Sequence, residues 1–185
     1  EEITFQGCRF ENSSVKSSQK NVRFIGCAFY EKGANTGSTR LLIGTDSSFT
    51  KCTFKDINSE RCVLSLSDPT IESCVFEDCV VYKTSLLSLN SGTISNSTFV
   101  RCRQVTYAHY GLIHIYRASI KQCIFSYCKA DGDKNHAPKL IYIQASSTIE
   151  NCRFEHCYAC YMIFLLSSAQ TNNTFHDCTC VKHVV

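Results

Sequence analysis

Cysteine and histidine gather near the end of the chain in a pattern that could bind a metal ion. The two segments, about one repeat apart, are His156-Cys157-x-x-Cys160 and His176-x-Cys178-x-Cys180-x-x-His183. Thiolate and imidazole are the ligands that Zn²⁺ prefers in proteins. The spacing matches no recognised zinc motif, and stacking of repeats alone would bring these cysteines together. We therefore predict packing or a Cys160–Cys180 disulfide and no metal. The alternative is a zinc site drawn from Cys157, Cys160, Cys178, Cys180 and His183.

A row of aromatic residues on successive repeats is the best candidate for ligand binding. His114, Tyr142 and Phe164 each occupy the outward position of an apolar strand segment, and Tyr110 flanks the row. Exposed rings with hydrogen-bonding neighbours suit sugar rings or a protein partner. The alternative is that a neighbouring loop covers the row, which would then serve only packing.

The chain shows no pattern typical of an enzyme. The outward positions of this strand in five repeats are Ser65, Ser88, His114, Tyr142 and Phe164, with no carboxylate among them. Glycoside hydrolysis needs paired carboxylates, and most acidic residues instead follow the repeated phenylalanine, where we expect them to be solvated. No Gly-x-Ser-x-Gly, phosphate loop or dinucleotide-binding motif is present. We predict that this segment is not an enzyme and binds no cofactor.

Three Asn-x-Ser/Thr triplets begin at Asn12, Asn96 and Asn172. Asn96 and Asn172, like Asn151, fall at a tight corner of the repeat, where we expect the side chain to point inward and bond to the backbone. Asn12 is therefore the candidate for glycosylation. The triplets favour a secreted route.

All of these residues are positioned by an internal repeat. Phenylalanine recurs at intervals of 19 to 29 residues, at Phe10, Phe29, Phe54, Phe76, Phe99, Phe125, Phe154 and Phe175. A repeat of this length is one supersecondary unit that stacks on its neighbours. Any function must therefore be sought on the surface of a solenoid.

Each repeat contains two strand patterns. The first alternates apolar and polar residues, as in Leu64-Ser65-Leu66. In the second, Thr70–Phe76, the inward residues are Ile71, Cys74 and Phe76, so a sharp two-residue corner must interrupt the alternation. The length variation falls after the phenylalanine, and no helical periodicity persists. We predict a coil with three short strands, two tight corners and one variable loop per turn.

The cysteines fall mostly into two columns of equivalent positions. The first contains Cys8, Cys27, Cys52, Cys74, Cys123 and Cys152, with Ser97 and Asn173 as replacements, and the second contains Cys79, Cys102, Cys128, Cys157 and Cys178, with Lys32 and Ile57 as replacements. Buried thiols pack as small hydrophobic groups, and Ser or Ile as replacements suits packing positions. We favour free, packed thiols. The alternative is a set of disulfides such as Cys74–Cys79, which would indicate an oxidising compartment.

The segments Ile71–Cys79 and Ile149–Cys157 resemble repeats of a known fold, the right-handed parallel β-helix of pectate lyases and tailspikes. More closely, they are similar to the Cys-rich β-helical repeats of polymorphic outer-membrane proteins and large protist surface proteins. The resemblance covers essentially the whole chain. It implies an all-β, right-handed parallel β-helix solenoid of about eight rungs, with three short strands per rung. It leaves function open, because the fold serves both enzymes and inert stalks.

Charge and hydropathy exclude two classes of partner. A net charge of +3, from 19 basic and 16 acidic residues, leaves no basic run dense enough to bind nucleic acid. The longest apolar stretch, Tyr161–Leu166, is far too short to span a membrane. The chain begins at Glu1 and ends in apolar residues without a polar cap, so we expect one β-helix domain over residues 1–185 that is a fragment of a longer chain.

We predict a non-enzymatic structural or adhesive scaffold within a larger surface or extracellular protein, with a glycan or a partner protein as its ligand. One alternative is a cytoplasmic or cytoskeletal protein that assembles end to end, with like chains or with other segments of its own chain. A second alternative is a polysaccharide lyase or hydrolase whose acidic residues lie outside this segment.

Overall fold

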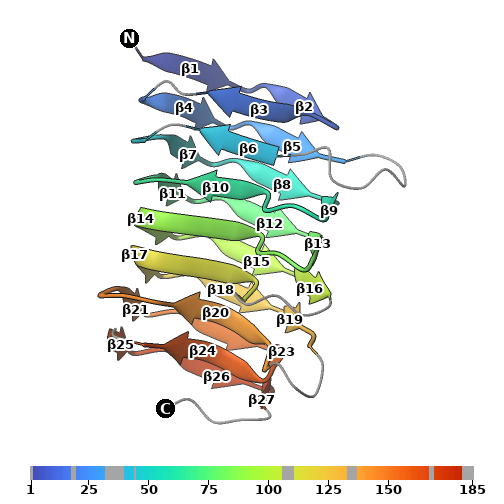
Figure 1. The fold of residues 1–185 in the computed structure, drawn as a ribbon, viewed down its shortest axis with the longest axis vertical. Coiled ribbons are helices and arrows are strands. Elements are labelled where there is room, and N and C mark those ends of the chain that lie inside the picture. The colour runs from blue at the N-terminus through green and yellow to red at the C-terminus, as the bar shows by residue number, and fades with distance from the viewer. Residues whose placement is uncertain are drawn as a thin grey trace.

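The computed structural model describes residues 2–17, 20–31, 40–43, 45–105, 111–132, 137–166 and 169–180. These residues form three parallel sheets of 13, 8 and 6 strands, whose strands stack along the long axis of the molecule from the N-terminal to the C-terminal end (Figure 1). A chain that pairs in parallel with itself one repeat later is a solenoid. The predicted all-β parallel fold is confirmed.

The 13-stranded sheet covers two sides of the coil, and β14 (Leu87–Ser95) and β17 (Ile113–Lys121) run without a break from one side to the other. The other strands on the first side are β3 (Ser14–Ser17), β6 (Arg40–Ile43), β10 (Leu64–Leu66), β20 (Lys139–Ile143) and β24 (Tyr161–Leu165). Those on the second side are β1 (Ile3–Gln6), β4 (Val22–Ile25), β7 (Ser48–Thr50), β11 (Thr70–Glu72), β21 (Thr148–Glu150) and β25 (Ala169–Thr171).

The 8-stranded sheet contains the repeated phenylalanines, and the 6-stranded sheet forms the remaining side. The strands of the former are β2 (Arg9–Glu11), β5 (Ala28–Tyr30), β8 (Thr53–Lys55), β12 (Val75–Glu77), β15 (Thr98–Val100), β18 (Ile124–Ser126), β22 (Arg153–Glu155) and β26 (Thr174–His176). Those of the latter are β9 (Asn58–Ser59), β13 (Val80–Tyr82), β16 (Arg103–Val105), β19 (Lys129–Ala130), β23 (Tyr158–Ala159) and β27 (Thr179–Cys180).

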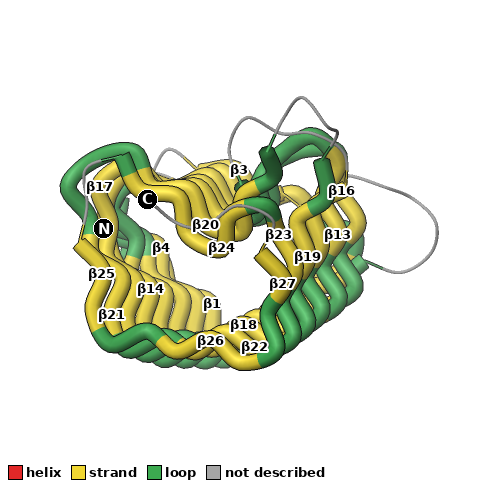
Figure 2. The backbone as a smooth tube through the Cα atoms, turned by 90° about the horizontal axis from the view of Figure 1, so that it is seen from below, coloured by secondary structure: helices red, strands yellow, loops and turns green. Residues whose placement is uncertain are grey.

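Equivalent strands of successive turns superpose when the coil is viewed along its axis (Figure 2). The register advances by one repeat per turn, so Phe76 of β12 lies opposite Phe54 of β8 and Phe99 of β15. With eight described strands in the phenylalanine sheet, seven turns separate the first from the last. Because side chains alternate along a strand, this register places equivalent residues in columns parallel to the axis.

Two sharp corners flank the phenylalanine strand, and each contains a residue with a left-handed backbone. At the first corner φ lies between 50° and 62°, in Gly7, Gly26, Lys51, Ser73, Asn96, Gln122, Asn151 and Asn172. At the second it lies between 47° and 55°, in Asn12, Asp56, Asp78, Arg101, Tyr127, His156 and Asp177. The next residue in the chain, such as Cys74 or Cys79, points inward and is buried. The predicted two-residue corner is confirmed.

At the first corner, the inward residue of the cysteine column bonds to the backbone. The thiol of Cys74 donates to the carbonyl oxygen of Phe49 in the preceding turn at 3.3 Å and to that of Glu72 at 3.4 Å. Where another residue replaces cysteine, it makes a similar bond: Ser97 Oγ donates to Ser95 O at 2.8 Å, and Asn173 Nδ2 donates to Ile149 O at 3.0 Å. A small inward donor therefore suits this first column, which explains why Ser and Asn can occupy it.

The eight repeated phenylalanines stack as one column through the core. Neighbouring ring centroids lie 4.6 to 4.8 Å apart with interplanar angles of 4° to 11°. Adjacent strands of a sheet are separated by about 4.7–4.9 Å, so the backbone ladder itself sets this ring spacing. The rings from Phe29 to Phe154 are fully buried, whereas Phe175 in the last described phenylalanine strand is 47% exposed.

Replacing Phe125 by alanine should lower the free energy of unfolding by about 3–5 kcal/mol, because it leaves a cavity between two stacked rings. The matched control is Phe175→Ala, which should cost clearly less because that ring is 47% exposed. Equilibrium denaturation of both variants measures the difference. Equal losses in the two variants would show that the column is not assembled as described.

Candidate functional site

An open groove of about 320 Å³ crosses the outer face of the first side of the coil, over β10, β14 and β17 and beside the end of β20. Its lining residues are Ser65, Leu66, Ser67, Ser88, Leu89, Asn90, His114, Tyr116 and Gln144. Parallel register places Ser65 beside Ser88, and Ser88 beside His114. Part of the row predicted from the sequence therefore lies in this groove.

A hydrogen-bonded network connects three turns of the coil across the groove. Ser88 Oγ lies 3.3 Å from His114 Nδ1, and His114 Nε2 lies 3.0 Å from Gln144 Oε1. Gln144 Nε2 in turn donates to the hydroxyl of Tyr142 at 3.3 Å. Since an amide oxygen can only accept, Nε2 of His114 must carry the proton, and Nδ1 then accepts from Ser88. The network thus fits a neutral imidazole with a defined tautomer.

Burial lowers the pKa of His114 below its ordinary value of 6.5, and the hydrogen bond to Gln144 acts in the opposite direction. The lowering agrees with the neutral ring that the network requires. The groove therefore presents an uncharged imidazole among hydroxyl and amide groups at neutral pH.

The rest of the predicted row continues beyond the groove as an aromatic stack. The ring of Tyr142 lies 5.5 Å from that of His114, at 16°, and 5.6 Å from that of Phe164. Tyr161 meets Phe164 edge to face at 5.0 Å. Lys139 Nζ lies 5.2 Å from the ring centroids of both Tyr142 and Phe164, and burial lowers the pKa of this lysine. The structure thus brings His114, Tyr142 and Phe164 together, while Tyr110 lies outside the described residues.

Sequence reasoning missed a second column of groove residues: Ser67, Asn90, Tyr116 and Gln144. Each follows the outward residue of its strand by two positions, as Tyr116 follows His114. Outward side chains recur every second residue in a strand, so extending the alternation by one step past the apolar segment would have found this column.

The described residues that line the groove include no carboxylate. Acidic residues after the phenylalanine instead pair between turns at the second corner: Arg101 lies 2.6 Å from Glu77 and 2.7 Å from Asp78, and Lys55 lies 3.0 Å from Glu77. Hydrogen bonds from Lys55 and Arg101 lower the pKa of Glu77, and one from Arg101 lowers that of Asp78. These acids belong to charged ladders on the surface.

Three of the four cysteines named as alternative zinc ligands direct their thiols to backbone carbonyls. Cys157 donates to Phe125 O at 3.4 Å, Cys178 to His176 O at 3.4 Å, and Cys180 to Cys160 O at 3.1 Å. His183 lies outside the described residues. Within the described part of the chain, the side chains that could share a metal ion are His156, His176 and Asp177 on the outer surface.

The asparagines at the corners lie differently from the sequence expectation. Asn96 and Asn172 occupy the left-handed corner position itself, with φ of 50° and 54°, and their side chains are exposed. The prediction that they point inward is wrong, because the corner residue faces out and its successor faces in. Asn12 is also exposed and lies at a corner, with φ of 47°. Glycosylation at Asn12 stays a prediction.

The sequence matches the protein family described as "Right handed beta helix region" over residues 1–140 and again over residues 41–184, which confirms the predicted handedness. No curated protein matches it. Similar solved structures include full-length QnrB1, described as a plasmid-mediated fluoroquinolone resistance protein, with 9% identity, 93% of each chain covered and a TM-score of 0.28. A trypsin-treated variant of QnrB1 has 8% identity, covers 94% of this chain and 89% of its own, and has a TM-score of 0.24. At these scores the likeness supports no statement about function.

Among the described residues, no helix has the length and apolar character needed to cross a membrane.

His114 should make the fold less stable in acid. Its folded-state pKa lies below 6.5, so between that pKa and 6.5 the unfolded chain binds more protons, and the free energy of unfolding falls as pH decreases. Denaturation at about pH 7.5 and pH 5 should show a smaller loss in His114→Gln than in the wild type. Both proteins share all other histidines, so the difference isolates His114. Identical losses would contradict its lowered pKa.

Native thiol labelling should divide the cysteines into two groups. All fourteen lie within the described residues, where their thiols form no disulfide: Cys8, Cys62, Cys178 and Cys180 are half-buried, and the other ten are buried. Burial also raises the pKa of Cys102 and Cys128 well above the ordinary value, and only the thiolate is nucleophilic. Iodoacetamide should therefore label the four half-buried cysteines first and the other ten only in denaturant. Any cysteine that needs reductant as well as denaturant is in a disulfide and contradicts the packed-thiol arrangement.

Proposed function

The chain belongs to the right-handed β-helix family, and on that premise we propose that it is a rigid, non-enzymatic scaffold that binds a neutral glycan along its outer groove. We further propose that it is part of a surface or extracellular protein. Four observations support this proposal: the stiffness of the coil, the chemistry of the groove, its direction along the axis and the absence of carboxylates among the described residues that line it.

Stiffness supports a scaffold role. The phenylalanine column is continuous through eight strands. Each turn is hydrogen-bonded to the next by the 13-stranded and 8-stranded sheets, and from β9 onward by the 6-stranded sheet as well. Bending such a coil would separate stacked rings and break backbone hydrogen bonds together. Loops on its outside can differ from turn to turn without disturbing this core, which suits display of a binding surface.

The groove presents groups that match the hydroxyls of a sugar. Its polar lining consists of serine hydroxyls, the amides of Asn90 and Gln144, the imidazole of His114 and the phenol of Tyr116. Sugar hydroxyls both donate and accept hydrogen bonds, as do these groups. The ring of Tyr116, at 39% exposure, offers a face for stacking against a sugar ring. The single observation that favours this function most is the Ser88–His114–Gln144 network at the groove surface.

The direction of the groove supports a chain-like ligand. Equivalent lining residues recur on neighbouring turns, which a parallel sheet spaces about 4.8 Å apart. A polymer lying along the axis could make similar contacts with each turn. A lining without carboxylates among the described residues supports binding rather than hydrolysis.

End-to-end assembly stays a second proposal. Phe175 is 47% exposed in the last described phenylalanine strand, where another turn would cover it. That turn could come from further residues of the same chain or from a second copy. Light scattering of the wild type against Phe175→Glu separates these cases, since only assembly of copies would be lost in the variant. The third proposal, an enzyme with acidic residues outside this segment, has no specific observation in its favour.

Glycan binding should weaken when Tyr116 is replaced by alanine. Losing one ring contact, worth about 0.5–1.5 kcal/mol, should reduce affinity by about two- to twelvefold. The matched control is Tyr158→Ala, because Tyr158 has the same 39% exposure but lies on β23, on another side of the coil. Binding is measured by calorimetry with neutral oligosaccharides of glucose, mannose and N-acetylglucosamine.

Thermal melts of both variants should match the wild type, which separates a binding effect from unfolding. Equal weakening by Tyr116→Ala and Tyr158→Ala would place the ligand elsewhere. If the wild type binds none of these oligosaccharides but binds charged ones, the groove chemistry described above is not what selects the ligand.

A further inference from the structure

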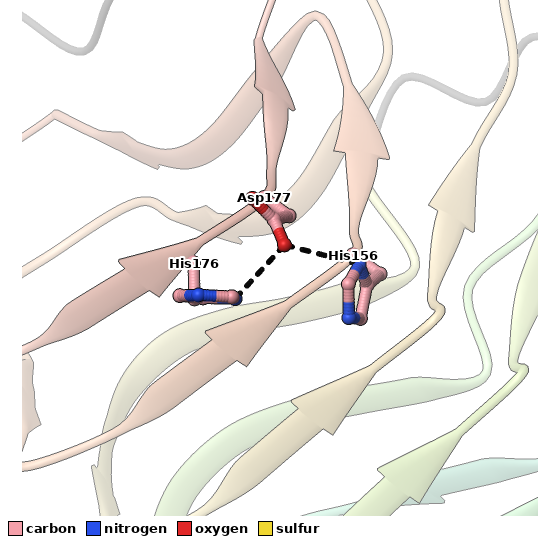
Figure 3. Close-up of side chains that lie close together, drawn as sticks. All are labelled: His156, His176 and Asp177. Carbon is pink, nitrogen blue, oxygen red and sulfur yellow. Dashed lines mark ion pairs between the residues drawn. The ribbon is translucent and has the colours of Figure 1, made fainter.

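A second set of chemically active side chains lies on the phenylalanine sheet, away from the groove. His156 follows β22, while His176 ends β26 and Asp177 follows it. Asp177 lies between the two imidazoles, as Figure 3 shows, with its Oδ2 3.1 Å from His176 Nδ1 and 3.8 Å from His156 Nδ1. One ligand atom from each of the three residues lies within 4.8 Å of the others.

The backbone holds these three residues at fixed separations. Parallel pairing places Glu155 opposite His176, so the next residues, His156 and Asp177, follow in the same register. The amide of His156 donates to the carbonyl oxygen of His176 at 2.9 Å. Both corner residues have a left-handed backbone, with φ of 50° and 49°. Because the corner residue faces outward, both side chains project from the same edge of neighbouring turns.

The imidazole of His156 is also oriented by its neighbour in the preceding turn. The ring of Tyr127 stacks on it at 4.7 Å with an interplanar angle of 16°. A ring held in this way loses less conformational freedom when it binds an ion. Sites formed on rigid elements with supported ligands bind metals more tightly than sites on loose side chains.

We propose that His156, His176 and Asp177 form a surface site for Zn²⁺ or a similar late divalent transition metal. Zn²⁺ bonds to imidazole nitrogen and carboxylate oxygen at about 2.0–2.2 Å, so tetrahedral ligand atoms lie ~3.3 Å apart. The observed 3.1 and 3.8 Å separations bracket that value. Water would supply the fourth ligand. The set differs from the thiolate set named from the sequence, because the cysteines of these turns face inward.

The ligand types also indicate the class of metal. Two nitrogen ligands and one carboxylate suit Zn²⁺, Cu²⁺ or Ni²⁺ better than Ca²⁺ or Mg²⁺, which take oxygen ligands. The site lies on β22 and β26, and the groove lies over β10, β14 and β17. Its test is therefore independent of the proposed glycan binding.

Calorimetric titration with ZnCl₂ of the chain without an affinity tag tests the proposal. The variants are His156→Asn, His176→Ser and Asp177→Asn. Asparagine is already present at the equivalent corner of another turn, as Asn12. Serine is already present at the position equivalent to His176, as Ser126. Each should weaken Zn²⁺ binding by at least about tenfold. The matched control is Asp56→Asn, a corner aspartate at φ of 55°, which should bind as the wild type does.

Histidine side-chain NMR gives a second readout that does not depend on affinity. Zn²⁺ should shift the imidazole resonances of His156 and His176 and leave those of His114 unchanged. A triple variant combines His156→Asn, His176→Ser and Asp177→Asn. Zn²⁺ binding that persists in it would assign the metal to the cysteines or to other histidines and would overturn the proposal. So would wild-type affinity in His156→Asn, which would reduce the cluster to an ordinary ion pair.

Discussion

A left-handed backbone at the ends of the phenylalanine strands is the constraint on which the remaining structure depends. For residues other than glycine this conformation costs roughly 1–2 kcal/mol. At Ser73 neighbouring turns offset that cost: its amide donates to Ser95 O at 3.1 Å, and Cys74 O accepts from Thr98 N at 2.9 Å. The thiol of Cys74 bonds to the preceding turn as well. An isolated turn would lack these contributions, so the corners and the stacking of turns stabilise each other.

The corners also decide which side chains become neighbours. Because the chain returns in parallel register, each residue lies beside its equivalent one repeat away, and the interior fills with columns such as the stacked phenylalanines. The outer surface follows the same rule. His114 reaches Gln144 across 30 residues of sequence, and His156 reaches Asp177 from the adjoining turn. The groove and the histidine–aspartate cluster are both produced by differences between turns, displayed on a repeated backbone.

Much of the fold could be predicted from the sequence, because inward positions require apolar or small residues. The alternation of Leu64-Ser65-Leu66 and the skipped position before Cys74 marked strand and corner correctly. The site was predicted only in part. His114 was named because it stands between two isoleucines of an apolar strand, whereas Tyr116 and Gln144 lie one position past the last isoleucine of that segment. Asn96 and Asn172 were placed inward wrongly, although the residues that follow them, Ser97 and Asn173, already filled the inward column.

By itself the sequence determined the repeat, the all-β character, the phenylalanine and cysteine columns and the row containing His114, Tyr142 and Phe164. Each of these follows from local periodicity, which requires no knowledge of how one turn contacts the next. Tertiary structure alone decided the hydrogen-bonded network of Ser88, His114 and Gln144 and the approach of Asp177 to His156 and His176. These depend on rotamers and on contacts between turns separated by loops of variable length, and neither is encoded in the spacing of residues along the chain.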